Sequence, residues 1–153
     1  MILDLFSQLP AKAQQTIEMD KGDILFYQSQ PTTGLYRVVE GSVTLQRTSL
    51  NGDTLTLHKA TAGGTFAEAS VFSDTYHCDA ICVEVGRVVK IAKADVNLKM
   101  ATDPVFSAGF TKHLAVQVQQ YRAQIELLAI GSAKDRVFAA VQAGYFDTTI
   151  KGL

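Results

Sequence analysis

Between residues 21 and 91, apolar and polar residues alternate over short stretches that turn residues separate. This pattern is typical of strands in an antiparallel sandwich or jelly roll. We expect a sharp break at Gly41, a connection near Gly86, and a hairpin at Asn51-Gly52, because both residues of that pair tolerate a positive φ. The predicted strands are residues 23–27, 35–39, 43–46, 55–58, 80–85 and 88–91.

The segments on either side of these strands follow a helical period. Residues 2–19 predict short helical pieces that form a lid on the main domain. After the strands, residues 95–100 predict a short helix. A long helix is then expected over residues 104–130, with Thr102 or Asp103 as its cap and a proline at its first position.

The end of the chain predicts two further helices. Gly131 is expected to end the long helix and Ser132 to cap the next one, which continues to Gly144. Residues 147–153 then resemble the start of another helix, so the chain stops inside an element. We therefore expect the sequence to be a truncated form of a longer protein.

Five apolar residues of the long helix recur at alternating spacings of four and three, which is the heptad pattern of a coiled-coil seam. This seam is longer than a small β domain needs for its own packing, so we expect the helix to join two chains in a homodimer. An amphipathic helix that lies on its own domain is the alternative. The seam residues are Leu114, Val118, Tyr121, Ile125 and Leu128.

The overall charge argues against a chain that binds nucleic acid by itself. The 153 residues carry a net charge of −1, with 47% hydrophobic and 19% charged residues, as in ordinary globular domains. No stretch approaches the roughly 18 apolar residues of a membrane span, and the first residues lack a signal-peptide pattern. Cys78 and Cys82 are too far apart along one predicted strand to form a disulfide, and free thiols suit the cytoplasm.

Residues 62–79 have the composition of a small ligand pocket. The stretch opens with Gly63-Gly64, where the backbone can approach other groups closely. Small residues around Ala67 leave backbone N–H groups accessible, and the carboxylate of Glu68 can accept hydrogen bonds from a hydroxyl-bearing ligand. A glycine-rich connection between two strands, with no ligand, is the alternative.

The order of these elements resembles the Crp/Fnr family of bacterial transcription regulators. The resemblance covers nearly the whole chain. It includes the early strands, a hairpin in the middle of the β roll, a phosphate-binding cassette, and the segment that leads into a winged helix-turn-helix. No single motif is decisive, but the order and spacing of the motifs are. The matching stretches are Lys21-Gly22-Asp23, residues 35–43, Asn51-Gly52, the cassette residues Gly63, Phe66 and Glu68, and residues 132–137.

The resemblance implies a mainly β fold, a double-stranded β-helix (jelly roll) of the cyclic nucleotide-binding-like type, followed by a long dimerisation helix. It implies a β-roll sensor domain at residues 1–102, the dimerisation helix at 103–130, and the start of a truncated winged helix-turn-helix at 131–153. The protein would be a cytoplasmic homodimer that senses an unknown small-molecule effector. It would reach DNA only through the missing C-terminal part and would bind no membrane.

The resemblance also implies an effector site whose phosphate clamp has been replaced. In cyclic nucleotide-binding members the glutamate holds the ribose 2′-hydroxyl and a downstream Arg-Ser pair grips the phosphate, and here that pair is Cys78-Asp79. We therefore expect cyclic AMP to bind weakly or not at all, with Asp79 placing a negative charge where the phosphate would sit. The pocket would better suit a neutral or hydroxyl-rich molecule, or a cation between Glu68 and Asp79. The implied ligand-binding residues are Gly63, Phe66, Ala67, Glu68, Ala69, Cys78, Asp79 and, on the long helix, Tyr121 and Arg122.

Three other kinds of protein remain open, and one of them is a purely structural dimerisation module, against which a small molecule bound in the purified protein would count. A cupin-like metal-dependent enzyme shares the β roll, but cupins bind metal through several His and Glu side chains, and three scattered histidines are too few. A haem or redox sensor could use His77 and Cys78, although adjacent strand residues point to opposite faces and cannot easily share one metal. No catalytic motif is present in the sequence, so we expect no enzyme activity, no cofactor and no metal site.

Overall fold

The computed structural model describes residues 2–130, 133–142 and 144. Residues 1–110 form one compact unit, and residues 111–153 form a second. The predicted domain limits at residues 102 and 130 are not tested by this division and stay a prediction. None of the described helices is long and apolar enough to cross a membrane.

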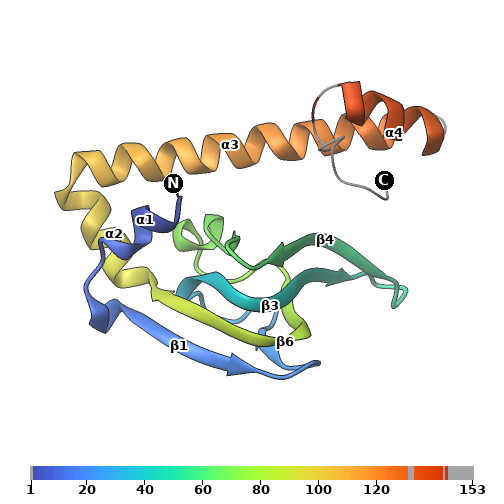
Figure 1. The fold of residues 1–153 in the computed structure, drawn as a ribbon. Helices are drawn as coiled ribbons and strands as arrows, with labels where there is room; N and C mark the ends of the chain where they lie inside the picture. Colours follow the sequence, from blue (N-terminus) through green and yellow to red (C-terminus); the bar gives the residue numbers. More distant parts are fainter. Residues whose placement is uncertain (1, 131–132, 143, 145–153) are drawn as a thin grey trace. The chain divides into compact units, whose positions relative to one another are not determined.

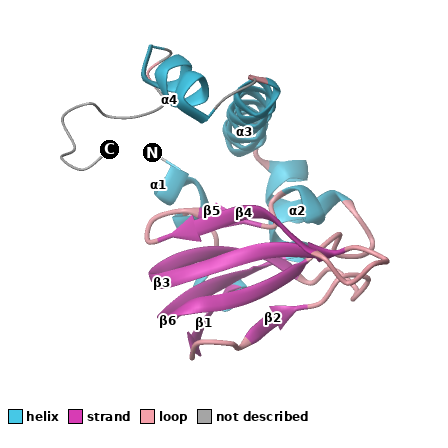
Figure 2. Ribbon diagram, turned by 90° about the vertical axis from the view of Figure 1, so that its right-hand side faces the viewer, coloured by secondary structure: helices cyan, strands magenta, loops and turns pink. Residues whose placement is uncertain are grey.

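The first unit is built on an antiparallel sheet in the order β1-β6-β3-β4, with β2 paired to β6 and β5 paired to β3. Figure 2 shows the long strands β3 and β6 in the middle, between β4 on one side and β1 on the other. The predicted mainly β, jelly-roll fold is confirmed. The strands are β1 (Gln14–Met19), β2 (Ile24–Phe26), β3 (Gly34–Thr48), β4 (Thr54–Thr61), β5 (Thr65–Phe66) and β6 (Asp79–Ala92).

The two longest strands run straight through glycines that were expected to interrupt them. Gly41 lies inside β3 with φ +84°, and Gly86 lies inside β6. The pairing register of β3 and β6 shifts next to Glu40 and Ser42, which is the signature of β-bulges. The predicted break at Gly41 and connection near Gly86 are therefore wrong, because the extra backbone is absorbed as bulges within continuous strands. The turn at Asn51-Gly52 is present, with Gly52 at φ +86°.

The helical prediction for residues 2–19 is correct only at its beginning. Helix α1 covers Ile2–Ser7 and a single 3₁₀ turn, η1, covers Ala11–Ala13, but residues 14–19 form strand β1. Its inner residues Ile17 and Met19 pair with Val88 and Gly86 of β6. The alternation of apolar and polar residues in this strand covers only six residues, which is too short to be distinguished from the helical pattern that precedes it. Pairing with β6 decides the conformation.

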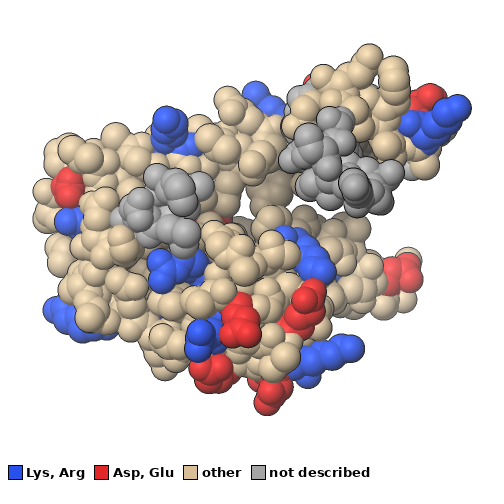
Figure 3. Space-filling view, in the orientation of Figure 1, with Lys and Arg blue, Asp and Glu red and all other residues tan. Residues whose placement is uncertain are grey.

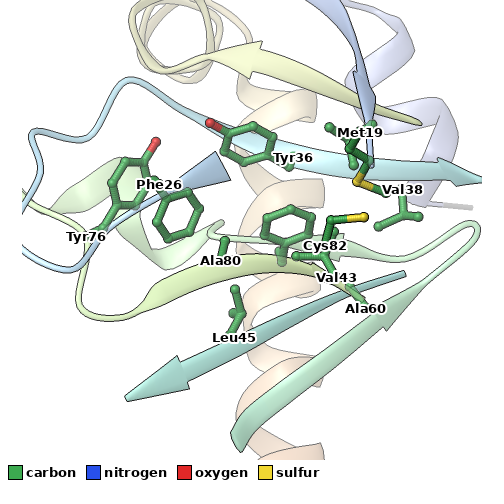
Figure 4. Packing of buried hydrophobic residues seen from close by; sticks show 12 residues of the cluster. Met19, Phe26, Tyr36, Val38, Val43, Leu45, Ala60, Tyr76, Ala80 and Cys82 are labelled. Atoms are coloured by element: carbon green, nitrogen blue, oxygen red, sulfur yellow. The ribbon is translucent and has the colours of Figure 1, made fainter. Parts of the chain in front are cut away.

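The interior of the β roll is filled mainly by aromatic rings. Phe26 and Tyr76 stack with their ring centroids 3.7 Å apart, and Tyr36 stacks on Phe66 at 5.0 Å. Figure 4 shows the rings of Phe26, Tyr36 and Tyr76 in one cluster with the smaller residues Ala80, Cys82 and Val43. The Tyr76 hydroxyl donates a hydrogen bond to the carbonyl of Gly34 at 2.9 Å. This buried hydroxyl is therefore satisfied by backbone and fixes the segment before β6 to the start of β3.

The helices after the sheet follow the predicted pattern closely. Helix α2 spans Lys93–Thr102, α3 spans Pro104–Ala129 and α4 spans Ala133–Gln142 (Figure 1). The Asp103 carboxylate accepts hydrogen bonds from the backbone N–H groups of Val105 and Phe106, which makes Asp103 the cap of α3. The predicted caps at Gly131 and Ser132 and the helix over residues 147–153 lie outside the described residues.

The first turns of α3 belong to the first unit and pack through aromatic side chains. Phe106 and Phe110 are fully buried and both meet the ring of Phe6 edge-on. Phe110 also lies 5.9 Å, between ring centroids, from Phe72 at the end of the 3₁₀ helix η2 (Ala69–Phe72). The beginning of α3 is thus in direct contact with the segment in which the candidate effector site was predicted.

Candidate effector site

The glycine pair at the start of the cassette is tied to β3 by two backbone hydrogen bonds. The N–H of Gly63 donates to the carbonyl of Val38 at 2.9 Å, and the N–H of Val38 donates to Gly64 at the same distance. Gly63 has φ +86° and lines an open hollow of about 330 Å³ together with Arg37, Val38 and Val39. These bonds fix where the chain turns back into the roll.

Ala67 adopts a backbone conformation that is uncommon for a residue with a side chain. Its φ is +65°, in the left-handed region, and it packs against the buried core cluster. This conformation turns the chain between β5 and η2 and directs the next residue inward. Glycine, which has no Cβ, would adopt this conformation without strain.

Glu68 is the residue that this turn buries. It immediately precedes η2, is 4% exposed, and its Oε1 atom is shielded from solvent. The carboxylate acts electrostatically on His58 of β4, whose pKa is lowered by burial while Glu68 opposes that shift. His58 pairs with the core residue Leu45 and so faces the inside of the roll. A buried acid and a half-buried imidazole therefore lie near one another inside the β roll.

Cys78 and Asp79 are on opposite sides of the sheet. Cys78 packs against the core cluster that contains Ala80, two residues further on, whereas Asp79 pairs with Gln46 on the other face. The Asp79 carboxylate accepts a hydrogen bond from the backbone N–H of Gln28 at 2.7 Å. The effect of the Asp79 charge on a ligand, and a cation held between Glu68 and Asp79, stay predictions.

Sequence reasoning missed Arg47, which the structure brings close to Cys78. The Nε–H group of Arg47 donates to the backbone carbonyl of His77 at 2.6 Å. Burial raises the pKa of the Cys78 thiol, the Arg47 guanidinium opposes this shift, and Asp79 adds to it. Only the pairing register of β3 with β6 reveals this neighbour, because Arg47 and Cys78 are 31 positions apart in the sequence.

The other predicted ligand-binding residues lie in different surroundings. Phe66 is 1% exposed and belongs to the aromatic core, and Ala69 is the exposed first residue of η2. Tyr121 and Arg122 are exposed on the part of α3 that belongs to the second unit. Their role at the effector site stays a prediction.

The predicted dimer seam is largely accessible on α3. Val118, Tyr121, Ile125 and Leu128 are exposed apolar or aromatic side chains, with Ile125 66% and Leu128 76% exposed, and Leu114 is half-buried. A row of apolar side chains of this kind on one helix marks an interaction surface. The homodimer itself stays a prediction.

The residues of the haem or redox hypothesis are separated by their environment. His77 is exposed, whereas Cys78 is half-buried against the core. Within the described part of the chain, no three His, Cys, Asp or Glu side chains form a group that could hold a metal ion. Cys78 and Cys82 are both free thiols.

Comparison with known proteins places the sheet in a recognised family. Residues 16–103 match the family model of the cyclic nucleotide-binding domain. The chain is 28% identical over 137 residues to the transcriptional regulator SdrP of Thermus thermophilus, covering 85% of this chain and 62% of the relative. It is 27% identical over 122 residues to the cyclic AMP receptor protein of the same organism, covering 79% and 56%. The chain thus spans about three fifths of the length of these curated relatives.

Solved structures agree on the fold. The catabolite activator protein of Thermus thermophilus superposes with a TM-score of 0.66 at 24% identity, over 84% of this chain and 58% of that one. FixK2 of Bradyrhizobium japonicum superposes with a TM-score of 0.74 at 15% identity, over 85% and 65%. The sensor domain of the regulator DNR from Pseudomonas aeruginosa gives 0.66 at 20% identity, over 84% of both chains. The chain belongs to the cyclic nucleotide-binding domain family, in its Crp/Fnr regulator branch.

Proposed function

We propose that this chain is the effector-sensing and dimerising region of a Crp/Fnr-type transcription regulator, that it works in the cytoplasm, and that it is not an enzyme. The family membership of residues 16–103 and the printed names of both curated relatives, a transcriptional regulator and a cyclic AMP receptor protein, support this role. The cupin-like enzyme is the less supported alternative, because both curated relatives are named as a regulator or a receptor protein.

The observation that carries the proposal is the buried carboxylate of Glu68. Taking a carboxylate out of water is unfavourable by several kcal/mol unless polar groups compensate it. Here it lies in a roll that is otherwise lined by aromatic and aliphatic side chains, and the strained turn at Ala67 helps to hold it there. Strained backbone and a buried ionisable group together are typical of a binding site. A carboxylate held in this position is an acceptor that a hydroxyl-bearing ligand could use.

We infer that cyclic AMP binds weakly. The position that aligns with the family's phosphate-binding arginine is Cys78, and burial keeps its thiol neutral because it raises the pKa. The loss of a charge-assisted pair costs about 2–5 kcal/mol, and about 1.4 kcal/mol corresponds to tenfold in affinity. A micromolar site would thus become roughly millimolar.

Calorimetric titration with cyclic AMP and cyclic GMP tests this inference directly. We expect no saturable binding below about millimolar concentration, by the same arithmetic. Low-micromolar binding of either nucleotide would contradict it. Native mass spectrometry of the purified chain tests the wider proposal, because it reports the mass of the dimer and of any retained effector. A monomer without ligand at micromolar concentration would contradict the proposed role.

DNA recognition is proposed for a part of the full-length regulator outside residues 1–153. The net charge of this chain is −1, and on the face shown in Figure 3 basic and acidic side chains are interspersed over the β domain. Binding to DNA depends on clustered basic residues that release counterions. We expect no specific retardation of DNA by this chain at physiological salt, and specific retardation by a longer chain that continues past Leu153.

A further inference from the structure

We propose a second binding site, on the outer side of the β roll, that takes a small carboxylate with an apolar body, such as an aromatic acid. The site is the open hollow of about 330 Å³ that Arg37, Val38, Val39 and Gly63 line. This volume lies at the lower end of the range of small-molecule sites, roughly 300–1,000 Å³. The site is separate from the proposed effector site at Glu68 and does not depend on it.

Strand β3 separates the hollow from the interior of the roll. The side chains of Tyr36 and Val38 belong to the buried core cluster (Figure 4). Because side chains alternate along a strand, the side chain of Arg37 lies on the opposite, outer side of β3. Val39 lies where the register between β3 and β6 shifts, and it is 40% exposed. A ligand in the hollow would therefore meet the Arg37 guanidinium and the Val39 side chain without entering the roll.

Arg37 brings a positive charge to the hollow that no carboxylate among the described residues neutralises. Arg37 is half-buried and takes part in none of the ion pairs found in the described part of the chain. Lys59 and Arg87, by contrast, are exposed, and they pair with Glu84 and Glu40. A half-buried guanidinium of this kind can bind a carboxylate through two parallel hydrogen bonds.

The backbone around the hollow favours a carboxylate over a phosphate. The N–H groups of Val38, Gly63 and Gly64 donate to the carbonyls of Gly64, Val38 and Thr61 at 2.9, 2.9 and 2.8 Å. Since these three donors are used within the protein, the anion is recognised mainly by the Arg37 guanidinium. One positive charge matches a carboxylate, whereas a phosphate monoester carries about −1.5 to −2 charges at neutral pH and needs more donors.

Gly63 leaves room for the ligand, and Val39 supplies an apolar surface for it. Gly63 has φ +86°, and a Cβ built on it would meet no atom within 4 Å. A side chain at position 63 would thus extend into open space, so its absence keeps the hollow accessible. The exposed Val39 side chain can pack against the apolar body of the ligand and remove apolar surface from water.

NMR titration of the ¹⁵N-labelled chain tests the site with three probes: benzoate, benzamide and phenyl phosphate. Benzamide has nearly the shape of benzoate but no charge. We expect benzoate to bind about tenfold or more tightly than either of the others, because it alone matches the single guanidinium. The backbone amide signals of Val38, Val39 and Gly63 should shift on binding, whereas that of Glu68 should not.

Three results of this titration would overturn the proposal. They are the absence of saturable shifts with benzoate, shifts that centre on another part of the chain, and benzamide or phenyl phosphate that binds as tightly as benzoate. The first two results exclude a site in the hollow, and the third excludes a carboxylate as its ligand.

Variants assign the binding to the named side chains. Arg37→Gln should weaken benzoate about tenfold or more, and Arg37→Lys should recover part of the loss because it restores the charge without the paired geometry. Val39→Asp should weaken benzoate as well, since it places a second carboxylate beside Arg37. Because Val39 is exposed, this variant keeps the test decisive if Arg37→Gln does not fold. Benzoate affinity that survives in either folded variant overturns the proposal.

Two controls separate this site from general charge effects and from the proposed effector site. Lys59→Gln is a matched loss of positive charge from a residue that already has a carboxylate partner, so it should leave the affinity for benzoate unchanged. A loss equal to that of Arg37→Gln would mean that only the overall charge matters and would overturn the site. Glu68→Gln should also leave benzoate binding unchanged, so this proposal and the proposed function can fail independently.

Discussion

Gly86 lies directly against the backbone carbonyl oxygen of Glu40, so close that a Cβ atom at position 86 would overlap that oxygen. The contact lies where the long strands β3 and β6 bulge past one another. Both partners are backbone, so neither can move away as a flexible side chain would. Gly86→Ala should therefore lower the free energy of unfolding by about 3 kcal/mol or more, in the range of severe backbone effects.

Urea denaturation followed by circular dichroism measures this loss. Gly52→Ala is the control for the conformational penalty alone, because Gly52 has φ +86° whereas Gly86 is not in the positive-φ region, and a Cβ at position 52 meets nothing within 4 Å. The control should lose only about 1–2 kcal/mol, the conformational penalty of a left-handed residue. Equal losses in the two variants would show that the contact with Glu40 is relieved by a small shift of the strands.

Ala67→Gly should stabilise the protein. Ala67 has φ +65°, which is unfavourable by about 1–2 kcal/mol for a residue with a Cβ, while glycine loses about 0.5–1 kcal/mol through its greater freedom when unfolded. We expect the free energy of unfolding to rise by roughly 0.5–1 kcal/mol. The rise is measured as a higher midpoint of urea denaturation with an unchanged m-value. Ala62→Gly, whose φ is not positive, should lose stability instead. A loss in both would mean that packing of the Ala67 methyl outweighs the strain.

Substitutions in the seam of α3 should separate the proposed dimer. Val118→Glu or Ile125→Glu would bury a carboxylate twice in a symmetric interface, at several kcal/mol each, so we expect monomers at micromolar concentration in sedimentation experiments. Gln120→Glu adds the same charge outside the seam and should leave the dimer intact. If the seam variants sediment as dimers with the β-sheet signal retained, the subunits meet elsewhere.

The stability of the β roll should fall in mild acid through His58. Burial lowers the pKa of His58 below its ordinary value of 6.5, so the folded protein binds this proton less readily than the unfolded chain does. The stabilisation is fully present above pH 6.5 and is lost as the pH falls through the lowered, folded-state pKa. His58→Gln should flatten the dependence of the urea midpoint on pH between 7 and 5. An unchanged slope would place the responsible group elsewhere.

The reactivity of Cys78 reports on its neighbour Arg47. Burial raises the thiol pKa above its ordinary 9.0 and the Arg47 guanidinium opposes that shift, so removal of the guanidinium should raise the pKa further. In a Cys82→Ala background, Arg47→Gln should therefore slow alkylation of Cys78 by iodoacetamide at pH 8.5, because less thiolate is present. Arg87→Gln should leave the rate unchanged. Faster alkylation in Arg47→Gln would mean that Arg47 mainly shields the sulfur.

The strands and helices could be predicted because their signals are local. Alternation of apolar residues located most strands, and Asp103 with Pro104 located the start of α3. The role of Gly41 and Gly86 could not be predicted, because a glycine inside an alternating run suits a turn and a bulge equally well. Strand pairing decides between them. Residues 14–19 became a strand for a similar reason, since only β6 supplies their partners.

The candidate site was predictable where it is local and not where it depends on pairing. Glu68 was singled out from the local composition of residues 62–79, whereas the left-handed turn at Ala67 was not predicted. The positions of Asp79 and Arg47 depend on the register between β3 and β6, and each bulge in that pairing shifts which residues share a face. A sequence does not state how many bulges intervene, so Asp79 was expected to face the ligand and Arg47 was missed.

The contact between Phe72 and Phe110 joins the segment of the proposed effector site to the helix that carries the proposed dimer seam. Phe72 ends the 3₁₀ helix that begins after Glu68, and Phe110 lies on the first turns of the helix that carries the dimer seam. If this contact makes the effector tighten the dimer by some factor, thermodynamic reciprocity requires the dimer to tighten the effector by the same factor. The apparent sensitivity to the effector would then rise with the concentration of the protein itself. The amount of regulator in the cell would set its own threshold of response.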